Sequence, residues 1–212
     1  MTQSDDRLPE PTPRTPREEV RRRLLAAAAK VFAERGYADS RLDDIARVAG
    51  FTKGAVYSNF GSKQELFGAL LRERSDAELT AVMAEARDSG DLGDAVHGAA
   101  RLVARRIVED TERGRLGLEF AARATRDEPT RETVAELRRA QREAASRSIA
   151  EVTRSDGRGP AVDPDLAALI VHCLTNGLSM EHLVDPGSVD AETAERALAA
   201  VLSALLGAPA RD

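Results

Sequence analysis

Tryptophan is absent from this chain of 212 residues, and aromatic residues make up only 3% of it. Cysteine occurs once, as Cys173, so no intrachain disulfide can form. No alternating run of β-branched residues predicts a strand, and no apolar run is long enough to span a membrane. Ala, Leu, Arg and Glu dominate the sequence, and these residues favour helices. These features predict an all-α protein of the reducing cytoplasm without a membrane-spanning segment.

Histidine is also scarce, with only His97, His172 and His182 present. Cys173 follows His172 directly, so on a helix the two side chains would point about 100° apart. The sequence contains no metal-ligand spacing, no Gly-rich phosphate motif, no nucleophile elbow and no pair of acidic residues in a catalytic context. We therefore expect no catalytic residues, no metal site and no cofactor.

Acidic residues exceed basic ones, and the resulting net charge of -5 is not typical of a protein that binds DNA. The charges are unevenly distributed, however. Residues 14–63 contain eleven Lys or Arg against six Asp or Glu, so this part carries about +5 and the rest about -10. The basic N-terminal part is therefore the expected site of contact with DNA.

Composition divides the chain into three parts. Residues 1–16 contain four prolines among polar residues and no apolar segment of signal-peptide length, which predicts a disordered tail. Residues 17–65 are expected to form a helix-turn-helix domain, and residues 66–208 a larger helical domain for ligand binding and dimerisation. Arginines from Arg14 to Arg23 lead into the first helix. They either touch the DNA backbone or minor groove, or form a solvated basic face.

Residues 40–67 read as two short helices around a glycine turn, followed by the start of a third helix. Ser40 and Asp43 form a Ser-x-x-Asp capping box, which predicts a helix that starts near Arg41. Gly50 supplies the positive φ that ends this helix at little steric cost. The next helix therefore follows after a single tight turn.

Thr52 is the predicted N-cap of the second helix, which covers Lys53 to Asn59. Val56 faces inward from this helix. A small residue where two helices cross, a permissive turn residue and an apolar wedge on the second helix define a helix-turn-helix, and Ala46, Gly50 and Val56 have that spacing. The segment therefore indicates a DNA-binding motif.

The second helix is too short to be stable alone, and Gly54 lowers its helix propensity by about 1 kcal/mol relative to alanine. Gly54 and Ala55 lie in the first turn, where their small side chains would let the backbone approach another surface closely. Ser62 and Glu65 form a second capping box that starts a third helix. The N–H groups of its first turn, together with the ammonium group of Lys63, suit a phosphate.

The run KGAVYSNFGSKQELF strongly resembles the recognition helix and the following helix start of the TetR family of one-component transcriptional regulators. The resemblance covers residues 20–70, including the preceding LLAAAAKVFAERGY helix. It implies phosphate contacts by Tyr57, Asn59 and Lys63, although the family often has histidine where this chain has Asn59. The positions that would face the major groove are Lys53, Gly54, Ala55 and Ser58, and Ser40, Arg41 and Thr52 complete the candidate DNA-binding residues.

Each assignment has a structural alternative. Tyr57 would instead pack on Leu66 or Phe67, Lys63 would be a solvated surface lysine, and Gly54 would be only a defect in its helix. The alternative function is a helical adaptor that binds protein alone. This alternative does not explain the residue types found in the second helix.

Beyond residue 67 the sequence predicts further helices. Gly114 and Gly117 bracket what reads as a weak, short helical segment. Pro129 fits the first position of a long amphipathic helix, and residues 154–161, rich in glycine and proline, predict a loop.

The last two helices indicate a homodimer. Asp163 and Pro164 start a helix that is apolar nearly all round, and residues 190–206 carry an apolar stripe. A helix that is apolar nearly all round must bury two sides, and a partner subunit can cover one of them. Two such helices from each subunit would form a four-helix interface, which the family resemblance also implies. The alternative is that both helices belong to the core of a monomer.

The resemblance further implies a pocket for a small-molecule inducer within residues 75–185, and LGLEFAARATRDEPTRETV is similar to the C-terminal halves of BetI-like regulators. Asn176 and His172 are the favoured lining residues, because polar groups on an apolar helix need partners. For Arg101, Arg123 and Glu119 the alternative is a solvated position. For His172 the alternative is a core histidine with its hydrogen bonds satisfied. The candidate ligand-binding residues are His97, Arg101, Glu119, Phe120, Arg123, His172, Asn176 and Met180.

Two recognition helices of a two-fold dimer enter successive major grooves when their centres lie about 34–36 Å apart, which implies a near-palindromic operator in double-stranded DNA. A ligand that changes this spacing weakens specific binding. The sequence thus predicts a DNA-binding transcriptional regulator. The family's usual mode implies a repressor that a small molecule releases from its operator.

Overall fold

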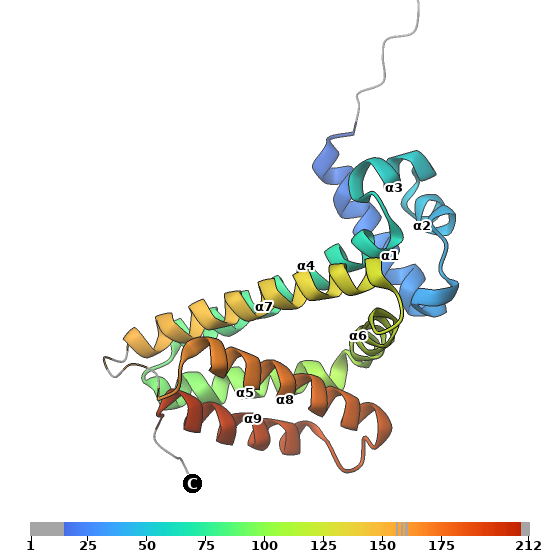
Figure 1. Cartoon of the computed structure of the whole chain (residues 1–212). Helices are drawn as coiled ribbons and strands as arrows, with labels where there is room; N and C mark the ends of the chain where they lie inside the picture. Colours follow the sequence, from blue (N-terminus) through green and yellow to red (C-terminus); the bar gives the residue numbers. More distant parts are fainter. Residues whose placement is uncertain (1–14, 156, 158, 160, 209–212) are drawn as a thin grey trace, which may run out of the picture.

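The structure is a computed structural model that describes residues 15–155, 157, 159 and 161–208. Within these residues the chain forms helices and connecting turns but no strand, which confirms the all-α prediction (Figure 1). Most of the predicted N-terminal tail, with Arg14, lies outside the described residues. The helices are α1 (Arg17–Asp39), α2 (Leu42–Ala49), α3 (Lys53–Phe60), α4 (Lys63–Asp88), α5 (Leu92–Glu109), α6 (Thr111–Ala124), α7 (Glu128–Ser155), α8 (Pro164–Val184) and α9 (Ala191–Leu206).

Helices α1, α2 and α3 form a small unit at one end of the molecule, drawn in blue to teal in Figure 1. Gly50 ends α2 in the left-handed conformation, with φ 75° and ψ 31°. Val56 of α3 is 1% exposed and Ala46 of α2 is 3% exposed, so both pack in the core of this unit. The predicted helix-turn-helix is therefore confirmed.

The start of α2 differs from the prediction. The helix begins at Leu42, its N-cap is Arg41, and no side chain caps it. Ser40 lies at the end of α1, where its hydroxyl donates a 2.6 Å hydrogen bond to the carbonyl of Gly36. Leu42 is buried, and the chain reaches it with the Ser40 side chain turned back toward α1. The Ser40–Asp43 capping box is therefore wrong, and Ser40, 3% exposed, leaves the candidate DNA-binding set.

Other helix starts follow the sequence. Ser62 Oγ accepts a 3.1 Å hydrogen bond from the N–H of Glu65, which confirms Ser62 as the N-cap of α4. The reciprocal bond of a capping box does not form, because the N–H of Ser62 donates to the carbonyl of Phe60. Asp163 Oδ1 accepts from two N–H groups at the start of α8, both at 3.1 Å, and Pro164 occupies the first helical position. Local capping chemistry therefore sets these boundaries.

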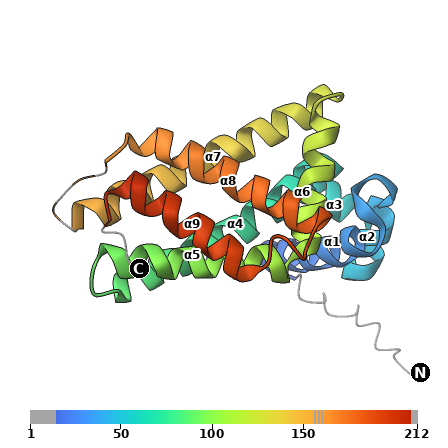
Figure 2. The same ribbon diagram turned by 90° about the horizontal axis from the view of Figure 1, so that it is seen from below.

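The C-terminal body is built around α4, which leaves the small unit and lies beside α7 (Figure 1). Helices α5, α8 and α9 form its other side, and α5 packs most extensively against α9 (Figure 2). Helix α6 contacts α1, α7 and α8, so it joins the body to the small unit. In the part of the chain that the structure describes, no helix combines the length and apolar character needed to cross a membrane.

Helix α6 corrects the prediction of a weak segment between two glycines. It runs unbroken through Gly114 and Gly117, and Asp110 caps its start by accepting a 3.1 Å hydrogen bond from the N–H of Arg113. A Cβ added at Gly114 would lie 2.7 Å from Ser179 Oγ on α8, so this glycine allows two helices to approach closely. Helix α7 also starts one residue before the predicted position, at Glu128.

Four aromatic rings connect the small unit to the body. The Phe67 ring of α4 lies 4.8 Å from Phe32 of α1 and 4.6 Å from Phe120 of α6, measured between centroids. Tyr37 lies 5.0 Å from both Phe67 and Phe120. All four side chains are fully buried or nearly so. The hydrophobic core is therefore continuous from α1 through α4 into α6.

Candidate DNA-binding surface and ligand cavity

Helix α3 presents one buried and one exposed face. Thr52 caps it by accepting a 3.3 Å hydrogen bond from the N–H of Ala55, as predicted. Val56 and Phe60 fill the core, whereas Tyr57 is 49% exposed. The alternative in which Tyr57 packs on Leu66 or Phe67 is therefore wrong. The side of α3 that faces solvent carries Lys53, Gly54, Tyr57 and Ser58.

Gly54 has no structural reason to be glycine. Its φ is not in the left-handed region, and a Cβ added there would meet only Thr52 Oγ1, at 3.7 Å. The fold therefore has room for a side chain at a position where helix propensity disfavours glycine.

Several polar side chains near α3 have partners within the protein. Asn59 Nδ2 donates a 2.7 Å hydrogen bond to the carbonyl of Ala55, and Ser58 Oγ donates to the same carbonyl at 3.1 Å. Lys53 Nζ donates to Asp43 Oδ2 at 2.9 Å, and this hydrogen bond raises the pKa of the lysine. In the free protein the ammonium group of Lys53 is therefore paired with a carboxylate.

Lys63 is held at the end of α1 rather than extended into solvent. Its Nζ donates a 3.0 Å hydrogen bond to the carbonyl of Ala38 and lies 4.6 Å from the centroid of the Tyr37 ring. Burial, and next the charge of Arg123, lower the pKa of Lys63. Burial also raises the pKa of Tyr37 to about 12. Lys63 thus stabilises the junction between α1 and α4 in the free protein, and the alternative of a solvated surface lysine is wrong.

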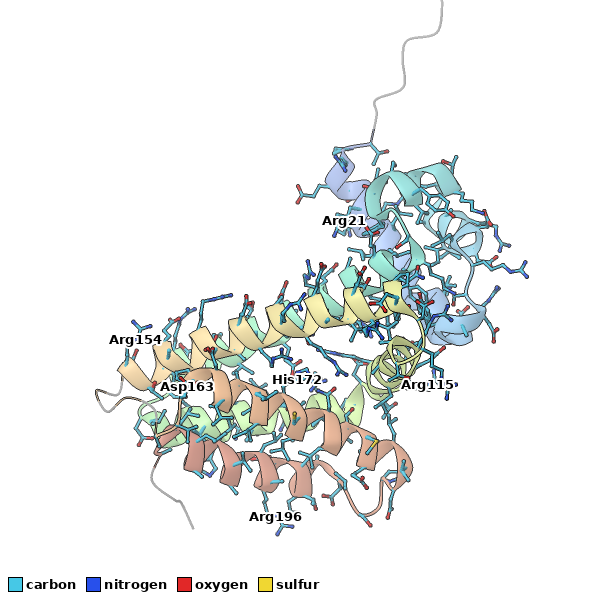
Figure 3. The ribbon with its side chains drawn as sticks, viewed as in Figure 1. Arg21, Arg115, Arg154, Asp163, His172 and Arg196 are labelled. Carbon is cyan, nitrogen blue, oxygen red and sulfur yellow. The ribbon has the colours of Figure 1, made fainter. Side chains whose placement is uncertain are left out.

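The arginines of α1 brace the helix-turn-helix. Arg21 lies with its guanidinium 4.5 Å from the centroid of the Phe60 ring (Figure 3). Arg23 donates a 2.8 Å hydrogen bond to the carbonyl of Ala49 and stacks over Phe51 at 4.7 Å. These side chains are exposed, so they add positive charge to the surface beside α2 and α3 as well as holding those helices.

A second candidate site is a cavity of about 330 Å³ inside the C-terminal body. Its walls come mainly from α4, α5, α6, α7 and α8, and most of the lining is apolar. The volume lies near the lower end of the roughly 300–1,000 Å³ that is typical of small-molecule pockets. Of the candidate residues, Phe120, His172 and Asn176 line it.

The other candidates do not line this cavity. His97 Nδ1 lies 2.8 Å from the carbonyl oxygen of Gly93, one turn earlier on α5. Arg101 is exposed and donates to Glu85 at 3.2 Å, and Met180 is 44% exposed. Because the sequence does not fix which neighbour covers each face of a helix, His97, Arg101 and Met180 were assigned to the wrong surface. Arg123 and Glu119 face α1 instead, and are also wrong as lining residues.

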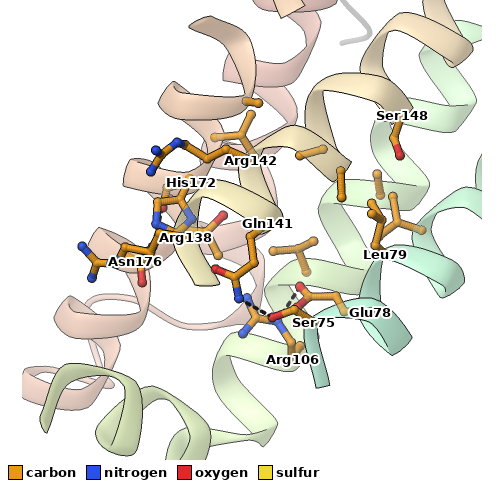
Figure 4. Close-up of a pocket in the computed structure, with 18 of the residues that line it drawn as sticks. Ser75, Glu78, Leu79, Arg106, Arg138, Gln141, Arg142, Ser148, His172 and Asn176 are labelled. Carbon is orange, nitrogen blue, oxygen red and sulfur yellow. Dashed lines mark hydrogen bonds and ion pairs between the residues drawn. The ribbon is translucent and has the colours of Figure 1, made fainter. Parts of the chain in front are cut away.

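One end of the cavity holds a cluster of polar residues that the sequence analysis missed. Arg106 Nε lies 2.6 Å from Glu78 Oε1, and an Arg113 terminal nitrogen lies 3.0 Å from Glu78 Oε2. Ser75 Oγ accepts a hydrogen bond from Arg113 at 3.0 Å. It accepts another from Gln141 at 2.6 Å (Figure 4). The carboxylate of Glu78 is thus neutralised by two arginines.

Another group of polar residues lines the cavity where α7 and α8 pack together, with Arg138 and Arg142 of α7 near His172 and Asn176 of α8 (Figure 4). Burial, then the charges of Arg138 and Arg142, lower the pKa of His172 to about 4. The His172 Nε2 atom is buried without a hydrogen-bond partner, whereas Asn176 Nδ2 donates to the His172 carbonyl at 2.7 Å. His172 is therefore a neutral polar group facing the cavity, rather than a satisfied core histidine.

A signal for the missed residues was present in the sequence. Val134, Leu137, Gln141, Ser148 and Val152 all line the cavity from one face of α7. They recur at helical spacing, so the polar members of this series interrupt an apolar stripe. Polar residues on such a stripe need partners, and that rule selects Gln141 as well as Asn176.

His172 provides a test of the cavity by pH. We expect its ring to titrate near pH 4 in the folded protein, well below the ordinary value of about 6.5. Between pH 6.5 and 4 the unfolded chain therefore binds a proton at His172 that the folded protein does not bind. The free energy of unfolding thus decreases as the pH falls from 6.5 to 4. Histidine NMR measures the midpoint, and His172→Gln should flatten the pH dependence of the unfolding free energy in that range. A midpoint near 6.5 would contradict the burial of the ring.

Comparisons with known proteins agree with this geometry. Residues 24–70 match the family described as bacterial regulatory proteins, tetR family, and residues 93–207 match the C-terminal domain described as a BetI-type transcriptional repressor. The regulator TtgR of Pseudomonas putida is 30% identical over 185 residues, covering 82% of this chain and 84% of TtgR. The activator FasR of Mycolicibacterium smegmatis is 36% identical over 103 residues, 49% of this chain.

Some of these matches are partial. The chain spans 47% of the length of FasR and 27% of SrpR from Pseudomonas putida. Among solved structures, a transcriptional regulator from Rhodococcus sp. Rha1 superposes with a TM-score of 0.68 at 23% identity, covering 90% of this chain and 99% of the other. FadR of Bacillus subtilis, solved in complex with stearoyl-CoA, gives 0.66 at 16% identity, covering 89% of this chain and 99% of FadR. These superpositions show a shared fold.

An N-terminal helix-turn-helix followed by a helical body defines the class of helix-turn-helix transcriptional regulators. The C-terminal match alone covers more than half of the chain, and TtgR is matched over most of its length. The chain belongs to the tetR family of bacterial regulatory proteins. Its relatives are transcriptional regulators, which is a non-enzymatic role.

Proposed function

We propose that the protein is a homodimeric repressor that binds a near-palindromic operator and is released from it by a small molecule. In this proposal residues 17–65 read the DNA, and residues 66–208 bind the ligand and dimerise. The observation that carries it is the exposed face of α3, where Gly54 is glycine although none of the described residues leaves too little room for a side chain there. The C-terminal match, described as a repressor domain, supports the sign of regulation.

The exposed apolar residues of α8 support the dimer. Leu166, Leu169, Met180 and Val184 are 49%, 42%, 44% and 78% exposed, and together they spread along the length of one helix. Large apolar side chains gathered on one surface mark an interaction site. A second copy of the chain that covers this surface would place two α3 helices in one two-fold assembly.

Operator binding is the decisive experiment. A duplex recovered by selection from random sequence is titrated with the protein and followed by fluorescence anisotropy at several salt concentrations. We expect salt-sensitive, sequence-specific binding of two chains per duplex, and release by some members of a small-molecule library. Binding that does not distinguish the selected duplex from random DNA would contradict the proposal and favour an adaptor that binds protein alone.

Substitutions of two lysines distinguish contacts to phosphates from contacts to bases. Lys63→Ala should weaken binding to all sequences and reduce the salt slope by about one unit, because one phosphate contact is lost. Lys53→Ala should also relax the preference at particular base pairs, by about 1–3 kcal/mol if the contact is bidentate. Lys30→Ala, at an exposed position of α1, is the control. Wild-type binding by both variants would show that the surface is wrongly assigned.

A further inference from the structure

Among the residues that the structure describes, the two arginines of α7 that line the cavity have no paired carboxylate. Arg138 and Arg142 are half-buried and lie one turn apart, so two like charges face each other on one helix. In the part of the chain that the structure describes, neither guanidinium has an ion-pair or hydrogen-bond partner. Partly buried cations without an anion are costly unless something binds them.

The other charges of the lining do not supply that anion. Glu78 is held by Arg106 and Arg113, at 2.6 and 3.0 Å. Asp76 is exposed to solvent. Four arginines therefore line the cavity against two carboxylates, one of them neutralised and the other hydrated. The charge of the lining is complementary to an anion.

His172 points to the same place from the opposite helix. Its ring lies beside Arg138 and Arg142, and its buried Nε2 atom lacks a partner (Figure 4). An unsatisfied buried polar atom on a cavity wall indicates a missing hydrogen-bond partner. An anion between α7 and α8 would complete the bonding of the histidine and of both arginines.

Apart from the polar cluster around Glu78, most of the remaining lining is apolar and leaves room for a hydrocarbon. Val82, Val96, Val103 and Leu202 are among its apolar residues, and a Cβ added at Gly117 would meet no heavy atom within 4 Å. The cavity of about 330 Å³ suits a ligand of modest size. A bound molecule would therefore present one charged end and one apolar body.

We propose that the ligand is an amphipathic carboxylate, whose acid group binds Arg138 and Arg142 beside His172 and whose apolar body fills the space between α4, α5 and α6. This inference rests on the proposed function, because it names the chemical class of the releasing molecule. Paired guanidinium groups are well suited to carboxylate recognition.

Calorimetry with the full chain tests the ligand class without DNA. The probes are decanoate, decanol and decyltrimethylammonium, which share a chain and differ in charge. We expect decanoate to bind at least tenfold more tightly than decanol, and the cation not to bind. Equal affinity for decanoate and decanol would overturn the proposal. Decanoyl-CoA is a fourth probe, and tighter binding of this thioester than of decanoate would overturn the assignment of a free carboxylate.

Substitutions locate the acid group. Arg138→Gln with Arg142→Gln should abolish the preference for decanoate over decanol, whereas Arg147→Gln, an exposed position of α7, should leave it unchanged. A preserved preference in the double variant would overturn the site. The proposed function is tested separately. If decanoate binds through these arginines but does not release the operator, the result contradicts ligand-induced release and leaves the binding site intact. A neutral molecule that releases the operator where decanoate does not bind contradicts only the ligand class.

Discussion

Replacing Gly54 with leucine should leave the free protein folded and reduce operator affinity by about 100-fold or more, equivalent to about 2.7 kcal/mol. The first turn of α3 has open space at this position, so the leucine side chain would extend into solvent. On DNA the same side chain would stand where the backbone must approach the major groove. Chemical denaturation and fluorescence anisotropy with the selected operator measure the two effects.

Gly54→Ala is the matched control for this prediction, because it changes stability and affinity in opposite directions. Alanine should raise the stability of the domain by up to about 1 kcal/mol, since glycine is the poorer helix former. Operator affinity should still fall, though less than with leucine. If Gly54→Leu binds the operator as tightly as the natural chain, α3 does not lie in the groove as proposed.

The helix-turn-helix could be predicted from the sequence because its determinants are local. Gly50 sets the turn, Thr52 caps α3 and Val56 forms the wedge, and all three lie within a few residues of the structure that they specify. The capping role predicted for Ser40 was wrong because its hydroxyl donates backward, to the carbonyls of Val31 and Gly36 in α1, and not toward α2.

The cavity could be predicted only in part. His172 and Asn176 were found because polar residues are conspicuous on an apolar helix. The same reasoning could not distinguish Arg101 from Arg106, which lines the cavity, because both lie on α5 and both pair with a glutamate of α4. The residues that pair across helices far apart in sequence are set by packing, which periodicity does not reveal.

Glu119 should control communication between the cavity and the DNA-binding unit. Its carboxylate accepts hydrogen bonds from the backbone N–H groups of Tyr37, at 3.0 Å, and Ala38, at 2.9 Å. Gly36 has φ 74°, so the helical geometry of α1 is broken there and these two N–H groups take a partner from another helix. The same helix α6 lines the cavity through Gly117 and Phe120. A ligand that shifts α6 therefore acts directly on the end of α1.

We expect Glu119→Ala to keep operator binding and to lose most of the response to ligand. Coupling between two sites is typically 1–3 kcal/mol, about 5–150-fold in affinity, and hydrogen bonds to a charged group are worth about 1.5–3 kcal/mol, enough to carry it. The measurement is the ratio of operator affinities with and without a releasing ligand. Glu119→Gln, which keeps one acceptor oxygen, should give an intermediate ratio, and exposed Glu132→Ala should give the natural one. A folded Glu119→Ala variant with an unchanged ratio would place the coupling in the aromatic core instead, where Phe120 meets Tyr37 and Phe67.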